Sequence, residues 1–325
     1  MTSITTYCAL FTVVSLFWFQ TTYAQFAGAR APRNKARIIL DYQGDVLNEN
    51  PNKRITERQK IIGADVDVNV YKTKKYLLTL GGRIEGLDTG SNSLQFDGQT
   101  DVGRTLTDQI FTVSGKKTID DKGRSFGMAL SYGSASDNSF AREQDSAVSL
   151  TAAYSFAKSE KSQWLLLANY SNNRAFLNNI PLPSVLYLYM PSKYFIASVG
   201  LPFISLNWMN YKTYSYKIYL SPVGIGFDLA RQIYGPAMFY TKFDFKVQTY
   251  MHENRVIEDD RLFYEDKRFE VGLKSFLSKK FQLSIGAGYS FDRKIYQAES
   301  IFDAGITKQD LGKDVYMSTK LTVNF

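Results

Sequence analysis

The C-terminal stretch VYMSTKLTVNF, residues 315–325, decides the fold class. Apolar and polar side chains alternate along it with period two, and the chain ends on Phe325. Successive side chains of an extended strand point to opposite faces. One face of this strand therefore carries the more apolar set, which is Val315, Met317, Thr319, Leu321, Val323 and Phe325. The other face is polar.

The same alternation recurs from about residue 36 onward. Clear examples lie at 64–70, 126–133, 148–156 and 242–248. Many of these stretches run to about ten residues or more, as a tilted membrane strand needs, whereas soluble strands average about five or six. No apolar run after residue 24 approaches the roughly 20 residues of a spanning helix. A chain of this kind would have to cross a membrane as strands.

The connections between these stretches alternate in length, with one tight exception at Pro222 and Val223. Short polar turns such as 72–74 and 278–280 alternate with longer segments such as 87–105 and 251–266. Transmembrane barrels have such short turns at one end and long loops at the other. The pattern predicts an antiparallel up-and-down β-barrel with both termini at the turn end. The expected strands are fourteen, near 36–46, 60–71, 75–86, 106–117, 123–134, 145–157, 162–172, 195–209, 214–221, 224–231, 237–250, 267–277, 281–292 and 313–325.

The strand count depends on the segment 173–209. Four prolines interrupt this segment, and the alternation changes phase near Pro202. Proline cannot donate a hydrogen bond to a strand ladder, so it weakens the assignment of a strand. We expect an even number of strands, with twelve and sixteen as the alternatives to fourteen.

Residues 1–24 differ from the rest of the chain. They contain no charged residue, 9–19 is apolar, and Thr22 and Ala24 provide small residues at the positions that precede a cleavage site. We interpret 1–24 as a signal peptide, 25–35 as a periplasmic segment and 36–325 as the barrel. An uncleaved N-terminal anchor or an internal segment is the alternative for 1–24. The single cysteine, Cys8, lies in the leader, so the mature chain would have no disulfide, thiolate zinc site or cysteine nucleophile.

The composition narrows the list of partners. Aromatic residues make up 15% of the chain, and several flank the expected turns, as Tyr71 and Tyr76 do. Aromatic rings at such positions are typical of the interface belts of a membrane barrel. The net charge of +8 favours anionic partners such as lipopolysaccharide. The basic residues are scattered rather than clustered with aromatics, which argues against nucleic acid.

Catalytic and metal-binding patterns are weak. The only histidine, His252, precedes Asp259 and Asp260 and suggests a water-activating group, but a solvated histidine in an acidic loop is the favoured interpretation. Carboxylates at Glu253, Glu258, Asp259, Asp260, Glu265 and Asp266 could hold a divalent cation, yet their spacing matches no EF-hand. We expect a charged, hydrated loop, with no catalytic residue, metal ligand or cofactor.

The remaining candidates concern the interior of the barrel. Lys242, Asp244 and Lys246 occupy the polar phase of their strand and are expected to face the lumen. The segment 175–194 is too apolar for a loop in water, and we expect it either to fold into the lumen as a gate or to form one more strand. The candidate gating residues are Leu182, Val185, Leu186, Tyr187, Leu188, Tyr189 and Met190.

Two resemblances support a location. The last strand with its terminal Phe325 resembles the C-terminal signature of outer-membrane barrels, which implies recognition by the barrel assembly machinery. The motifs at 180–183, 191–193, 200–203, 263–268 and 289–293 resemble an uncharacterised family of outer-membrane barrels of Bacteroidetes-type bacteria. The second resemblance covers roughly residues 160–325 and implies a barrel in the outer membrane of a Gram-negative cell, without an assigned activity.

The functional expectation is a non-enzymatic outer-membrane barrel that acts as a solute channel, a transporter or a ligand-binding barrel. A structural or adhesive barrel that uses the acidic loop 251–266 is one alternative. A barrel that hydrolyses lipids or peptides through His252 is the other.

Overall fold

The computed structural model describes residues 36–46, 58–90, 94, 96, 102–120, 124–210, 213–253, 255, 257–303 and 308–325. The expected signal peptide 1–24 and the segment 25–35 lie outside these residues. Within the described part, no helix has the length and hydropathy to cross a membrane.

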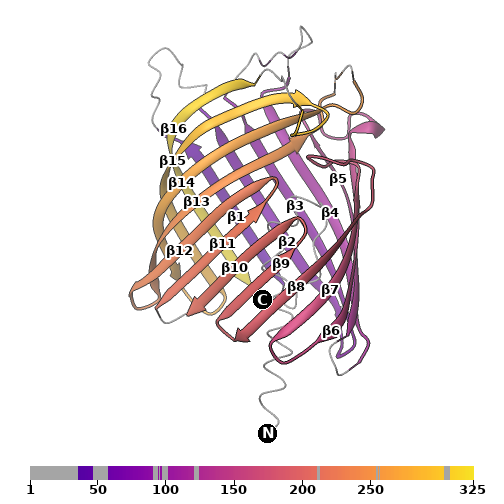
Figure 1. The fold of residues 1–325 in the computed structure, drawn as a ribbon. Coiled ribbons are helices and arrows are strands. Elements are labelled where there is room, and N and C mark those ends of the chain that lie inside the picture. The colour runs from indigo at the N-terminus through magenta and orange to yellow at the C-terminus, as the bar shows by residue number, and fades with distance from the viewer. Residues whose placement is uncertain are drawn as a thin grey trace.

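Sixteen described strands form one closed barrel in which each strand is antiparallel to both neighbours and β1 closes the ring against β16 (Figure 1). A short 3-10 helix, η2 (Glu143–Asp145), precedes β6. The strands are β1 (Arg37–Asp45), β2 (Lys60–Lys72), β3 (Tyr76–Asp88), β4 (Thr105–Thr118), β5 (Ser125–Ser136), β6 (Ser146–Lys158), β7 (Ser162–Ser171), β8 (Leu182–Ser192), β9 (Phe195–Gly200), β10 (Phe203–Asn210), β11 (Tyr214–Ser221), β12 (Gly224–Tyr234), β13 (Ala237–Tyr250), β14 (Arg261–Phe276), β15 (Phe281–Ala298) and β16 (Gln309–Asn324).

The expected barrel class and the even number of strands are confirmed, but the count of fourteen is wrong. The two missed strands lie in the proline-interrupted segment, where β8 occupies part of a connection and the expected strand 195–209 is divided into β9 and β10. The change of phase near Pro202 marks the turn between those two short strands, since β9 ends at Gly200 and β10 starts at Phe203. In the sequence, two short strands differ from one long strand only by this change in the phase of the alternation.

The alternation places polar side chains inside the barrel and apolar ones outside. On β4, Phe111 and Val113 are 61% and 50% exposed on the outer face. Thr112, between them, is buried inside, where its hydroxyl lies 2.8 Å from that of Ser131 on β5. The outer surface is thus apolar over many strands, whereas a soluble protein of this size rarely exposes such a surface.

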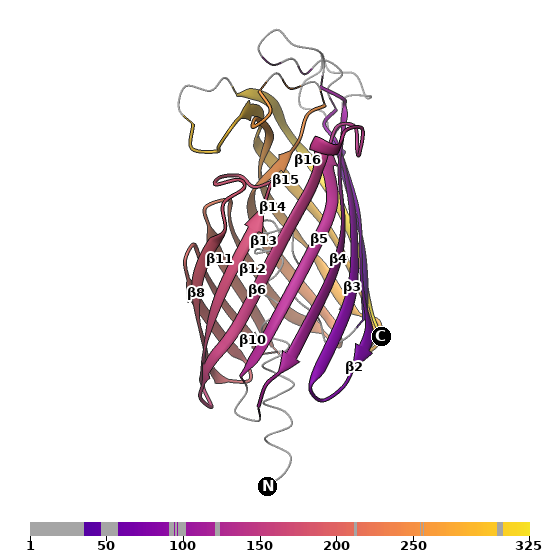
Figure 2. The ribbon, with the colours of Figure 1, turned by 90° about the vertical axis from the view of Figure 1, so that its right-hand side faces the viewer.

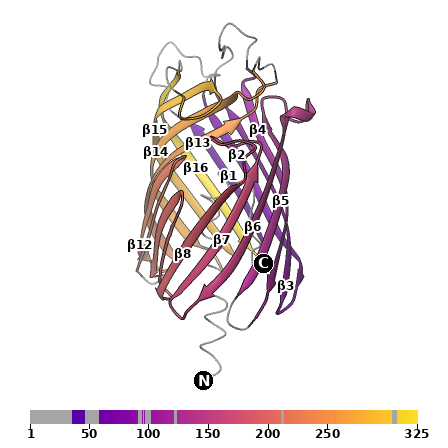
Figure 3. The same ribbon diagram turned by 45° about the vertical axis from the view of Figure 1, so that its right-hand side comes forward.

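Strand β13 crosses the barrel at the end that carries the long connections, which we call the loop end. It pairs with β12 only as far as Lys246, whereas its pairing with β14 continues to Tyr250. Met251 then forms a parallel bridge with Ser136, and its N–H donates to the carbonyl of Ala135 at 2.6 Å. Figures 2 and 3 show the orange end of β13 inclined toward β5. Because β5 and β13 are on opposite sides of the ring, this bridge pinches the barrel.

The bridge divides the barrel at the loop end. On one side of it, side chains fill the space that β1–β5 and β13–β16 enclose there. Its apolar cluster draws on β2–β5 and β13–β16, and includes the fully buried Leu87, Leu106, Leu262 and Ile295. On the opposite face of β13–β15, Phe263 and Tyr296 stack with ring centres 5.2 Å apart and pack against Ala175 of the β7–β8 loop. Both faces of the crossing segment are therefore covered by packed side chains.

Candidate luminal site and its closure

A cavity of about 370 Å³ lies inside the barrel, lined by residues of β1–β3 and β11–β16. Lys242, Asp244 and Lys246, the lumen candidates from the sequence, all line it. They occupy alternate positions of β13, so the pleat of the strand points all three side chains inward. The lining is polar and charged, which makes the cavity suitable for water and for small polar solutes.

Asp244 is the centre of the strongest charge group in this cavity. Its Oδ2 lies 3.0 Å from Nζ of Lys242 and 3.4 Å from Nζ of Lys246, and its Oδ1 accepts a hydrogen bond from the Tyr219 hydroxyl. The Asp244 side chain is 5% exposed. Two ammonium groups thus share one buried carboxylate, which keeps one unit of positive charge at the cavity wall.

Glycines opposite the luminal tyrosines keep the cavity open. A Cβ atom on Gly226 would lie 2.5 Å from the ring of Tyr219, which rests on that glycine. A Cβ on Gly286 would lie 2.5 Å from the hydroxyl of Tyr240, which donates to Oε1 of Glu270 at 2.7 Å. With no side chain beneath them, both tyrosines lie close to the wall.

A polar constriction separates this cavity from a smaller one of about 70 Å³. Gln248 lines both spaces and donates from Nε2 to Oε1 of Glu85 at 2.5 Å. Arg83, on the same strand as Glu85, pairs with Asp108 and lies 3.8 Å from Glu85. The contact of Gln248 with Glu85 joins β13 to β3 across the interior.

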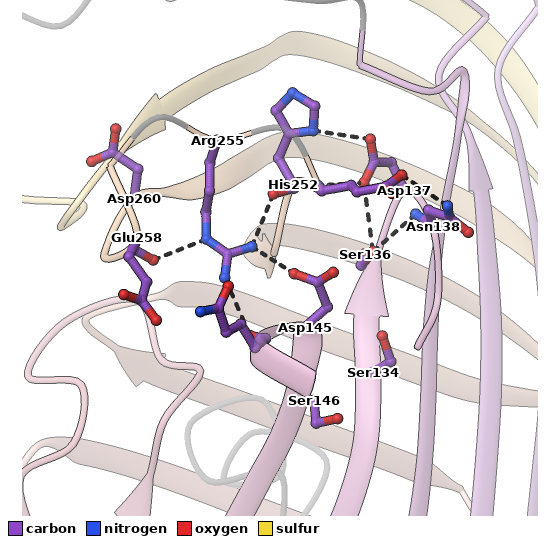
Figure 4. A network of polar contacts seen from close by, with 12 residues as sticks. Ser134, Ser136, Asp137, Asn138, Asp145, Ser146, His252, Arg255, Glu258 and Asp260 are labelled. Atoms are coloured by element: carbon purple, nitrogen blue, oxygen red, sulfur yellow. Dashed lines mark hydrogen bonds and ion pairs between the residues drawn. The ribbon is translucent and has the colours of Figure 1, made fainter. Parts of the chain in front are cut away.

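Above the constriction, the β13–β14 loop is joined to the β5–β6 connection by a set of contacts that we call the latch. The latch consists of Asp137, Asn138, Asp145, His252, Glu253 and Arg255, and Figure 4 labels all of these except Glu253. Nδ1 of His252 lies 3.0 Å from Oδ2 of Asp137, and the N–H of Glu253 donates to Oδ1 at 3.1 Å. Asn138 donates to the carboxylate of Glu253 at 2.8 Å. The latch thereby secures the bridge that pinches the barrel.

The ion pair of Arg255 with Asp145 completes the latch. Nη1 of Arg255 lies 2.6 Å from Oδ1 of Asp145, and the two side chains are 6% and 0% exposed. The same guanidinium donates to the carbonyls of Gln144, His252 and Glu258. A buried pair supported by this many hydrogen bonds keeps the two connections in one arrangement.

The acidity of the Asp137 carboxyl is perturbed by its surroundings in the latch. Burial raises the pKa of its carboxyl, but the hydrogen bonds from His252 and the Glu253 backbone outweigh burial, so the pKa lies below its usual value. The ionised form is therefore the one that the latch stabilises.

The structure corrects the expectation of a solvated histidine. His252 is 2% exposed, and its carboxylate partner is Asp137 rather than the neighbouring Asp259 or Asp260. Asp260 instead accepts a hydrogen bond from Gln297 at 2.9 Å. No sequence signal pointed to Asp137, because it precedes His252 by 115 positions and only the closure of the ring brings the two together.

The acidic segment is also divided between several partners, so the expectation of one hydrated acidic loop is wrong. Glu265 and Asp266 belong to β14, where Glu265 contacts Lys308 and Asp266 pairs with Arg268. Asp266 is 2% exposed. Across the described residues, no three His, Cys, Asp or Glu side chains lie close enough together to hold a metal ion.

The apolar segment proposed as a gate is part of the wall, as the alternative of one more strand predicted. It forms β8, whose inward Leu186 and Leu188 pack with Leu165, Leu167 and Phe203. Val185 and Tyr189 face outward and are 45% and 40% exposed. A plug made of Leu182 to Met190 is therefore incorrect, because both of its faces are accounted for by the barrel wall.

Fold and interior together define a closed β-barrel with an apolar exterior, a charged internal cavity and a strand end that crosses the barrel at the loop end. No protein-family model matches the chain, and no curated protein matches it. Similar solved structures include the outer membrane channel of Pseudomonas putida F1, at 12% identity and TM-score 0.35, covering 92% of this chain and 98% of that one. A second is the trimeric form of OmpT, an outer membrane protein of Vibrio cholerae, at 9% identity and TM-score 0.32, covering 89% of this chain and 98% of that one. A third is a mutant porin of Rh. blastica, at 6% identity and TM-score 0.33, covering 90% of this chain and 99% of that one. Likenesses this distant carry no argument about function.

Proposed function

We propose that this chain is a non-enzymatic outer-membrane β-barrel that takes small polar solutes into its lumen. The apolar outer face supports a membrane location, because a closed barrel satisfies its backbone hydrogen bonds internally and can face lipid. We also propose that Phe325, which follows β16 directly, contributes to insertion by the barrel assembly machinery. On this proposal the outer surface contacts membrane lipid and lipopolysaccharide.

The observation that carries the proposal is the charged cavity enclosed by the ring. A cavity of about 370 Å³ is within the range of small-molecule sites, roughly 300–1,000 Å³. Its wall holds Lys242, Asp244 and Lys246 in the alternation that points luminal residues inward. An interior used only to support the wall would be filled with side chains, as in the narrowest barrels.

The bridge that crosses the ring at the loop end makes this a gated barrel in our proposal. In our proposal the gate is the latch with the β13–β5 bridge, in place of the segment that the sequence suggested. Solute passage toward the loop end would require the bridge of Met251 with Ser136 to open. Because β13 leaves β12 after Lys246, the segment that moves would be the end of this one strand.

Planar-bilayer recording on the purified full-length protein tests the proposal. We expect rare openings in the wild type and frequent ones in the Asp145→Asn variant, which removes the charge that Arg255 contacts. Asp120→Asn is the matched control, since it breaks the Asp120–Arg124 pair at a turn at the opposite end, where Arg124 is 49% exposed. Silence of both the wild type and Asp145→Asn, together with no protection of the protein by any solute, would refute the function.

The hydrolase alternative has a separate test. A hydrolase that used His252 would cleave lipids or peptides and would lose that activity in His252→Ala. We expect no cleavage by the wild type, and we expect His252→Ala to increase channel opening, because His252 contacts Asp137 within the latch.

A further inference from the structure

Two pairs of oppositely charged side chains face each other on neighbouring strands of the cavity wall without forming an ion pair. We call these the open pairs. Lys217 on β11 lies directly opposite Asp228 on β12, and Lys320 on β16 lies opposite Asp41 on β1. All four residues line the cavity. Opposed side chains of neighbouring strands are close enough for ion pairing. Among the described residues, however, neither pair has its nitrogen and oxygen within 4.0 Å.

The Asp228 carboxylate has an unfilled hydrogen-bonding position. Its Oδ1 is buried and has no hydrogen-bond partner in the described structure. Buried polar atoms without a partner are rare in native proteins, because leaving one unpaired costs about 1–3 kcal/mol. On the opposite strand, Nζ of Lys217 lies 5.5 Å from the centre of the Tyr219 ring instead of on Asp228. A cationic group of a ligand beside Asp228 would pair electrostatically with this carboxylate.

The ammonium groups of the same cavity also have capacity for a ligand. Lys217 and Lys320 line the same cavity as Lys242 and Lys246, and the latter two share the single carboxylate of Asp244. An incoming carboxylate between these lysines would reduce the repulsion between their ammonium groups. Six cationic and five carboxylate side chains line the cavity, so its charge is nearly balanced and a purely anionic ligand is not the best match.

We propose that the cavity binds a zwitterionic solute of the size of an amino acid or short peptide, with its carboxylate near Lys217 and its ammonium near Asp228. The pair formed by Lys320 and Asp41 provides a second position of the same kind across the cavity. This inference rests on the proposed function, since it names the class of solute that the lumen takes up. The structure supports it because each open pair offers one charge of each sign.

Titration calorimetry on the detergent-purified full-length protein tests the inference with four probes. They are dialanine, succinate, 1,4-diaminobutane and sucrose, which present a zwitterion, a dianion, a dication and a neutral solute. We expect saturable binding of dialanine and at least about tenfold weaker binding of the other three, equivalent to about 1.4 kcal/mol. Lys217→Gln and Asp228→Asn should each weaken dialanine binding by about tenfold.

Two further variants separate a lost contact from a damaged wall. The charge exchange Lys217→Asp with Asp228→Lys keeps both charges in register, so we expect it to bind dialanine within about threefold of the wild type. Lys193→Gln, in the exposed turn before β9, should have no effect. Tighter binding of succinate than dialanine, strengthened by Asp228→Asn, would overturn the inference in favour of an anion site. Channel openings without saturable dialanine binding would overturn the inference while leaving the proposed function intact.

Discussion

Removal of one charge from the latch should open the bridge of β13 with β5 without unfolding the barrel. In Asp145→Asn the guanidinium of Arg255 remains buried and loses its only carboxylate contact in the described structure. Breaking a buried ion pair from one side costs about 3–5 kcal/mol. Arg255 keeps three carbonyl acceptors, so we take the lower value, about 3 kcal/mol, which corresponds to roughly a hundredfold rise in the population of the open latch.

Amide hydrogen exchange at Met251 measures this opening directly. Its N–H donates to the carbonyl of Ala135 and forms part of the bridge, so it exchanges when the bridge opens. We expect exchange about a hundredfold faster in Asp145→Asn, with unchanged exchange in the centre of β15 and in the Asp120→Asn control. Unchanged exchange at Met251 would refute the latch, and acceleration over all strands would show that Asp145 stabilises the whole barrel instead.

Three further predictions concern the latch, the cavity and assembly. Because the pKa of Asp137 is lowered in the folded protein, its contribution to the stability of the latch is present at neutral pH and is lost as the pH falls through that lowered pKa. Channel opening should increase over the same pH range, and Asp137→Asn should abolish this pH dependence. Gly226→Ala should displace Tyr219 into the cavity and reduce the conductance of the open channel, whereas Gly82→Ala, with open space around the new Cβ, should not. Deletion of Phe325 should lower the amount of barrel inserted in the outer membrane, as measured by heat-modifiable mobility in gels, with little effect on the refolded protein.

The luminal residues show what a local pattern can predict. Lys242, Asp244 and Lys246 were expected in the lumen because charge recurs in the polar phase of a strand whose other phase is aromatic, and all three line the cavity. The same reasoning does not distinguish a gate from a strand at 175–194. An apolar run with prolines is compatible with both, and only pairing with β7 and β9 makes Leu182–Ser192 a strand.

The sequence by itself determined the barrel class, the inward and outward phases, the even number of strands and the common end of both termini. These properties follow from a period of two and from the lengths of connections, which are local features of an extended backbone. Tertiary structure alone decided the closure. The contact of Asp137 with His252 and the bridge of Ser136 with Met251 join opposite sides of the ring, and no local pattern records which strand will leave its neighbour and cross. The open pairs of Lys217 with Asp228 and of Lys320 with Asp41 depend likewise on the register that the closed ring imposes.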